Sequence, residues 1–103
     1  MGIGMQITYL GLPGAASLEA EAALQLLRLQ PYSAYFSDCQ LVIEHVGQPS
    51  GNSLYDVRLE IGTTALTLKR IARCVRDGAE AAIRCAFNKA VRVLEILSAH
   101  VNL

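Results

Sequence analysis

The residues in this sequence best suited to chemistry are positively charged and close together. The run from Lys69 to Arg76, KRIARCVR, places four cations within eight residues. Three more, Arg84, Lys89 and Arg92, follow in the next segment. Neutralising phosphate charge drives association with nucleic acid, so cations at this density are typical of a phosphate-binding surface. The sequence therefore offers a seven-residue candidate nucleic-acid patch.

A second interpretation of these cations is an ordinary solvated helix surface. Arg76 and Glu80 are four residues apart, and Arg92 and Glu95 are three apart. Those are the spacings at which opposite charges pair along a helix. The sequence leaves both interpretations open.

Other reactive side chains lack the companions that catalysis needs. His45 and His100 have no further ligand at metal-binding spacing, no serine lies in a nucleophile elbow, and no glycine-rich phosphate loop is present. We expect no catalytic residue, no metal, no cofactor and no small-molecule substrate. An enzyme is the weakest of the functional hypotheses.

The cysteines are odd in number and share no short spacing. Cys74 and Cys85 are eleven residues apart, and Cys39 is distant from both. We expect no disulfide and interpret all three as small apolar side chains in a reducing cytoplasm. No secretory signal is visible, and no apolar run approaches the roughly 20 residues of a membrane span. The sequence thus predicts a cytoplasmic protein without membrane contact.

Charge is divided along the chain although its formal sum is zero. Residues 1–59 carry two basic against five acidic residues, a net of −3, and residues 60–103 carry seven against four, a net of +3. A general nucleic-acid binder is usually basic overall.

The aromatic group Tyr32, Tyr35 and Phe36 can stack on bases, but it is better explained as a seal over one end of the core.

Hydrophobic periodicity indicates the elements that must position these residues. Alternating segments predict strands at Met5–Leu10, Cys39–Val46, Leu54–Ile61 and Thr64–Lys69. Helix formers from Leu18 to Leu29 predict a first helix, which Pro31 ends. The apolar stripe of a long second helix is made by Ala79, Ile83, Ala86, Phe87, Ala90 and Leu94.

This β-α-β-β-β-α order predicts a single α+β domain over residues 1–103. The first strand–helix–strand unit is a crossover that places its helix on the sheet, and the second helix covers the same face. The result is a two-layer sandwich of a four-stranded mixed sheet with two helices on one face.

Both helices carry more apolar residues than one buried stripe can use. The back of the second helix contains Ala81, Cys85, Arg92 and Ile96, flanked by Val91 and Val93. In the first helix, Leu24, Leu26, Leu27 and Leu29 cannot share one stripe. Exposed apolar helix surface favours a partner, and we expect a homodimer through these faces.

Three short motifs resemble one known family. V-R-L-E-I at Val57–Ile61, A-I-x-x-A-F at Ala82–Phe87 and V-R-x-L-E at Val91–Glu95 are similar to the second half of the ribosome hibernation factors, the ribosome-associated inhibitor family. The segment Tyr32–Val46 resembles that family's second strand, and the match extends from about Met5 to His100. The length is that of the family's short forms.

The resemblance implies a fold like that of double-stranded-RNA-binding domains. It also implies binding to the small ribosomal subunit and its rRNA near the decoding region, which inhibits translation or stabilises idle ribosomes under stress. The rRNA contacts would come from Lys69, Arg70, Arg73, Arg76, Arg84, Lys89 and Arg92.

Two departures from the family support an alternative. The loop Gly47–Ser53 has no histidine or basic residue, and the first helix has only Arg28, where family members commonly carry several cations. The alternative is a divergent member that acts through protein contacts, as a homodimer or with another protein, without binding RNA.

Overall fold

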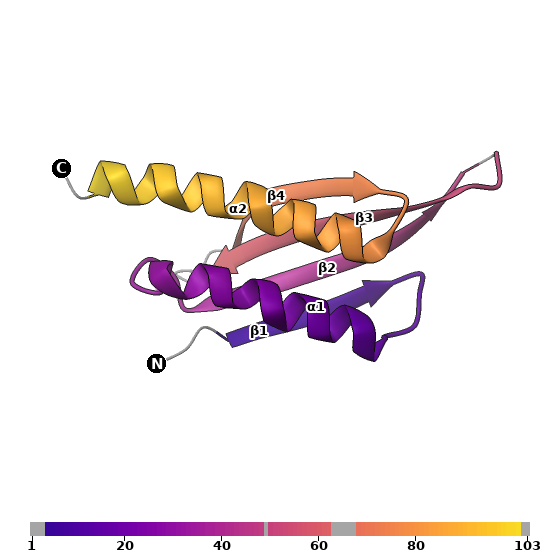
Figure 1. Ribbon diagram of the computed structural model, residues 1–103, viewed down its shortest axis with the longest axis horizontal. Coiled ribbons are helices and arrows are strands. Elements are labelled where there is room, and N and C mark those ends of the chain that lie inside the picture. Colours follow the sequence, from indigo (N-terminus) through magenta and orange to yellow (C-terminus); the bar gives the residue numbers. More distant parts are fainter. Residues whose placement is uncertain (1–3, 49, 63–67, 102–103) are drawn as a thin grey trace.

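The fold is a four-stranded sheet with helices on one side (Figure 1), seen in a computed structural model that describes residues 4–48, 50–62 and 68–101. In chain order the elements are β1 (Gly4–Leu10), α1 (Ala16–Leu26), the 3-10 helix η1 (Leu27–Tyr32), β2 (Asp38–Gly47), β3 (Ser53–Gly62), β4 (Leu68–Arg76) and α2 (Ala79–Val101). The sheet order is β1-β2-β3-β4; β1 and β2 are parallel, and the other neighbours are antiparallel. The predicted fold class is confirmed.

The core lies between the central strands and the helices. β2 and β3 alternate as predicted, and Leu41, Ile43, Val57 and Leu59 are fully buried on the helix side of the sheet. The predicted stripe of α2 packs on them, with Ile83, Ala86, Phe87, Ala90 and Leu94 inaccessible to solvent. Burying one large apolar side chain contributes about 1.5–3 kcal/mol, so this layer supplies most of the force that fixes α2.

The first helix runs beside α2 over the same face of the sheet (Figure 1). Leu18 and Ala22 of α1 and Leu29 of η1 are buried in the common core. The α-helix ends at Leu26, earlier than predicted, and Pro31 lies inside η1. The proline ring would clash with the carbonyl of the residue four positions earlier, Leu27, so the chain leaves the α conformation at that point.

The prediction for the fourth strand was wrong in its limits. We expected Thr64–Lys69, whereas β4 is Leu68–Arg76, and residues 64–67 lie outside the described part of the chain. Leu59 faces Ala72 and Glu60 faces Arg70, which leaves Ile71 as an extra residue in a β-bulge. The bulge interrupts the two-residue period on which strand prediction depends.

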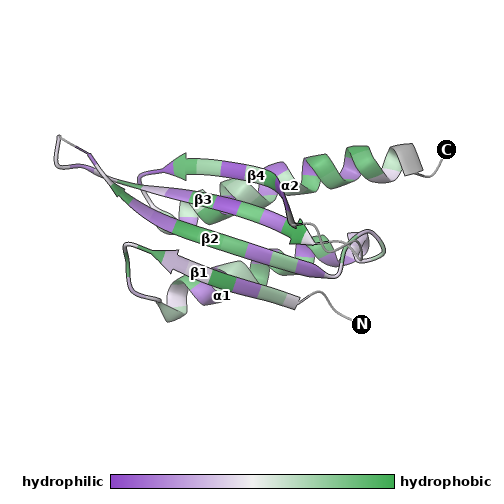
Figure 2. Cartoon of the chain, turned by 180° about the vertical axis from the view of Figure 1, so that it is seen from behind, coloured by the Kyte–Doolittle hydropathy of each residue, from purple (hydrophilic) through white to green (hydrophobic). Residues whose placement is uncertain are grey.

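The other side of the sheet, here called the open face, carries no helix (Figure 2). Hydrophilic and hydrophobic bands alternate along its strands, and Gln40 Nε2 of β2 donates to Thr8 Oγ1 of β1 at 3.3 Å. Antiparallel sheets commonly face water on one side in this way. Among the described residues, no helix has the length and apolar composition to cross a bilayer.

Candidate nucleic-acid interface

Four of the seven predicted cations lie in β4, which is an edge strand of the sheet. Lys69, Arg70, Arg73 and Arg76 are all exposed. In a regular strand, residues three positions apart point to opposite faces. The bulge at Ile71 changes this. Arg70 is the register partner of Glu60 and Arg73 that of Arg58, and both partners on β3 belong to the open face. The bulge therefore brings Arg70 and Arg73 to the same side.

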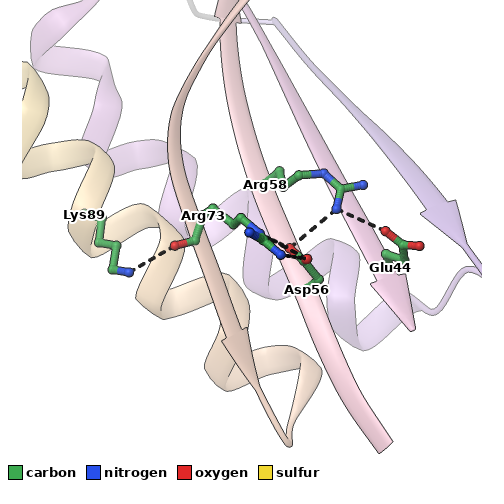
Figure 3. A network of polar contacts seen from close by, with 5 residues as sticks. All are labelled: Glu44, Asp56, Arg58, Arg73 and Lys89. Atoms are coloured by element: carbon green, nitrogen blue, oxygen red, sulfur yellow. Dashed lines mark hydrogen bonds and ion pairs between the residues drawn. The ribbon is translucent and has the colours of Figure 1, made fainter. Parts of the chain in front are cut away.

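A chain of ion pairs orders the open face beside β4 (Figure 3). Arg73 donates from Nε to Asp56 Oδ1 at 3.1 Å and from Nη2 to Asp56 Oδ2 at 2.7 Å. Arg58 Nη1 lies 3.5 Å from Asp56 Oδ1 and 3.0 Å from Glu44 Oε1. Two arginines and two carboxylates thus compensate one another, and Arg73 is less available to a phosphate than the sequence predicted.

Asp56 is the most buried acid of this chain of contacts. It lies on the open face, yet its side chain is only 7% exposed, because the two arginines cover it. The hydrogen bonds from Arg73 lower the pKa of the Asp56 carboxyl, and the charges of Arg73, Arg58 and Arg70 add to this effect against the opposing effect of burial. Asp56 is therefore an anion that orients Arg73.

The second helix adds two cations to the same edge of the molecule. Lys89 Nζ donates to the backbone carbonyl oxygen of Arg73 at 3.0 Å, which brings the side of α2 against β4 (Figure 3). Arg92 is exposed and lies three residues after Lys89, on the same side of the helix. We define the basic edge as the set Lys69, Arg70, Arg73, Arg76, Lys89 and Arg92.

The seventh predicted residue, Arg84, lies elsewhere. Its Nη1 pairs with Glu21 Oε1 of α1 at 2.9 Å, and Arg28 Nη1 donates to Asn88 Oδ1 at 2.6 Å. Gln25 connects Glu21 to Arg28 through hydrogen bonds of 2.8 and 3.0 Å. These contacts join the two helices, so the structure separates Arg84 from the basic edge.

The predicted helix ion pairs are not the explanation for the remaining cations. Arg76 ends β4 and so cannot pair with Glu80 along a helix. Within the described residues, Arg92 and Glu95 do not approach each other within ion-pair distance, and both are exposed.

The cysteine prediction was wrong for two of the three residues. Cys74 of β4 and Cys85 of α2 form a disulfide, with Cα atoms 6.0 Å apart. We expected no disulfide, but β4 extends far enough for Cys74 to face α2. Cys39 is a free, buried thiol, and burial raises its pKa to about 12.

The remaining candidates are structural. Phe36 is buried and Tyr32 and Tyr35 pack against the core, which confirms their interpretation as a seal. His45 Nε2 lies 2.9 Å from Ser53 Oγ, and its ring contacts Tyr55. No group of three or more potential ligands could bind a metal ion in the part of the chain that the structure describes.

The first helix exposes an apolar surface. Leu24 and Leu27 are 61% and 64% exposed, respectively, whereas Leu29 is fully buried. The α1 outer face, as we define it, consists of Ala16, Ala20, Ala23, Leu24 and Leu27, all exposed. No charged residue belongs to this face.

Comparison with solved structures finds the same fold in proteins of low sequence identity. A ribosomal subunit interface protein from Coxiella burnetii superposes with a TM-score of 0.77 at 15% identity, covering 94% of this chain and 99% of that one. The Thermus thermophilus Protein Y N-terminal domain superposes with a TM-score of 0.68, also at 15% identity and with the same coverage. No protein-family model and no curated protein matches the sequence. At this identity the likeness establishes the fold.

Proposed function

We propose that this chain binds the small ribosomal subunit near the decoding region through its basic edge, and so inhibits translation or stabilises idle ribosomes under stress. The observation that carries the proposal is the convergence of six cations from β4 and α2 on one edge of the molecule. The protein would act sterically as a cytoplasmic binding module, without catalysis. Its fold is shared with a protein of the ribosomal subunit interface, which supports the ribosome as the source of the RNA.

The electrostatics of the edge favour a backbone contact rather than base recognition. Arg70, Arg76 and Arg92 are exposed, and none of them bonds a carboxylate among the described residues. Mobile exposed cations neutralise phosphates without reading sequence. Arg73 has a different role, because Asp56 fixes its guanidinium on the open face.

Co-sedimentation with purified small subunits at low and moderate salt tests the proposal. We expect salt-sensitive binding by the wild type and a clear loss in the double variant Arg76→Gln/Arg92→Gln. Each lost phosphate contact should reduce the slope of log K against log salt by about 0.7–0.9. Arg73 is left unchanged in this test because its removal would leave the buried Asp56 without its main partner.

The matched control is Arg28→Gln/Arg84→Gln, which removes the same charge from the contacts between the helices. We expect it to bind like the wild type. Equal loss in both variants would show that only net charge matters, and wild-type binding by the edge variant would contradict the proposed site.

The α1 outer face favours a second candidate function, association between two copies of the chain without RNA. Its small residues, Ala16, Ala20 and Ala23, precede its large ones, Leu24 and Leu27. In an antiparallel two-fold pairing, the leucines of one copy would face the alanines of the other, which makes the surface self-complementary. The face is only about 16 Å long. We expect it to bury less than the about 800 Å² per partner of a standard interface, and the association to be weak, with a micromolar dissociation constant.

A further inference from the structure

The structure contains a covalent contact inside the basic edge that the proposed function does not use. Cys74 lies between Arg73 and Arg76 on β4, and Cys85 lies one helical turn before Lys89 on α2. Their disulfide joins the two elements that supply every cation of the edge. It closes the segment that contains the β4–α2 turn, so it restricts how α2 sits against β4.

The three cysteines differ in their access to solvent. Cys85 is half-buried at the surface of α2, Cys74 is 2% exposed, and Cys39 is 3% exposed. Burial raises the pKa of Cys39 to about 12, so its thiol stays protonated and does not compete in thiol exchange, for which the thiolate is required. Only the Cys74–Cys85 pair therefore combines proximity with access to a reagent.

We propose that Cys74 and Cys85 form a redox-reversible crosslink that sets how tightly the basic edge binds RNA. The inference deepens the proposed ribosomal function and, for its effect on binding, depends on it. In the oxidised state the crosslink fixes Lys89 and Arg92 relative to Arg70 and Arg76. In the reduced state the same cations remain, but their relative positions are less restricted.

The oxidant is a low-molecular-weight disulfide such as glutathione disulfide. The Cys85 thiolate, which is the more accessible, attacks one sulfur of that disulfide, forms a mixed disulfide and displaces one thiolate, which takes up the proton that Cys85 lost. Cys74 then attacks the Cys85 sulfur, closes the protein disulfide and displaces the second thiolate, which is protonated in turn. Two protein thiols are oxidised and one small disulfide is reduced to two thiols; excess small thiol reverses both steps.

Pre-organisation predicts the direction of the effect. A binding surface whose side chains are already positioned loses less conformational freedom on association. We therefore expect the oxidised protein to bind small subunits roughly three- to tenfold more tightly than the reduced protein. We also expect a higher thermal midpoint for the oxidised form, since the crosslink restricts the unfolded chain.

The first measurement is thiol content. Native protein is equilibrated in glutathione buffers of increasing oxidised fraction, alkylated and weighed intact. We expect one alkylated thiol under denaturing labelling at the oxidising end, three at the reducing end, and a reversible transition between them. A pair that stays bonded throughout, or never forms, would overturn the inference whatever the ribosome does.

The second measurement is small-subunit binding by both redox forms of the wild type and by Cys85→Ser. We expect the variant to bind small subunits as tightly as the reduced wild type does, with an affinity that does not change with the redox buffer. Cys39→Ser serves as the control and should keep the redox response. A reversible pair with equal binding in both forms would refute the regulatory role alone, whereas no binding in either form would refute the proposed ribosomal function.

Discussion

At the scale of single residues, one carboxylate organises the charges of the open face. Asp56 accepts two close hydrogen bonds from Arg73 and lies within ion-pair distance of Arg58, which also contacts Glu44. A nearly buried anion with two cationic partners is costly to remove, because its partners would lose their counter-charge. Asp56 therefore stabilises the sheet and also holds Arg73 in position.

We expect Asp56→Asn to lower the free energy of unfolding by about 1–3 kcal/mol at neutral pH. The pKa of Asp56 lies below its ordinary value of 3.8 in the folded state, so its contribution is complete above that pH and is lost as the pH falls through the folded pKa. Urea unfolding between pH 7 and pH 2 should thus show a steeper acid loss for the wild type than for the variant.

The control for this experiment is Glu60→Gln, on the same strand and the same face but without an ion pair among the described residues. It should change the stability by less than about 0.5 kcal/mol. An identical pH profile for wild type and Asp56→Asn would show that the ion pairs contribute nothing to folding.

At the scale of elements, the segment from α1 into η1 contains leucines with opposite environments. Leu27 is exposed and Leu29 is fully buried, although only Arg28 separates them in the sequence. The change from α to 3-10 geometry at Leu27 determines which side chain enters the core. One face of this segment thus supports the fold, and the other remains available for contact.

Alanine substitution should separate these two roles. We expect Leu29→Ala to cost about 2–5 kcal/mol, since it leaves a cavity in a packed core, and Leu27→Ala to cost less than about 0.5 kcal/mol. Chemical denaturation of both variants at low protein concentration measures the difference. A large cost for Leu27→Ala under those conditions would mean that its environment is buried in solution.

The central strands could be predicted from the sequence within one residue at each end, because strict alternation continues through β2 and β3. The limits of β4 could not, since the bulge at Ile71 places two apolar residues next to each other. The same error explains why the disulfide was not predicted. A strand that ends at Lys69 does not include Cys74, so the predicted fold did not place Cys74 opposite α2. A contact between residues of two different elements cannot be read from their spacing in the sequence.

In the candidate site, too, some features could be predicted from the sequence and others could not. Four of the predicted cations form a local run in the sequence, and the structure places all four in one strand, β4. Proximity in sequence predicts that Arg84 and Lys89 lie together, but five residues rotate a helix by about 500°, so the two side chains point about 140° apart. Arg84 accordingly reaches Glu21 of α1 and Lys89 reaches β4. The ion pair of Arg73 with Asp56 also depends on cross-strand neighbours that only the fold brings together.

At the scale of the whole molecule, the basic edge and the α1 outer face lie on different elements. The basic edge is formed by β4 and α2, whereas the α1 outer face lies on α1 and on Leu27, the first residue of η1. The two surfaces could therefore serve different partners, and their contributions can be measured independently.

We expect Leu24→Gln/Leu27→Gln to abolish any concentration-dependent self-association while leaving RNA binding unchanged. Sedimentation velocity at micromolar concentrations measures the oligomeric state. The control is Leu10→Gln/Val46→Gln, which changes two exposed apolar residues of β1 and β2 and should leave self-association intact. A strict monomer across this range would remove the second candidate function.

The parallel pairing of β1 with β2 has a consequence for how the chain is made. Gly4 pairs with Asp38, 34 residues later in the sequence, and an antiparallel hairpin cannot replace this contact. A nascent chain grows by about 5–20 residues each second, so β1 waits roughly two to seven seconds for β2, its neighbour in the sheet. During that interval α1 has neither the sheet nor α2 to cover its apolar residues. The N-terminal third of the protein is thus the segment most in need of protection during synthesis.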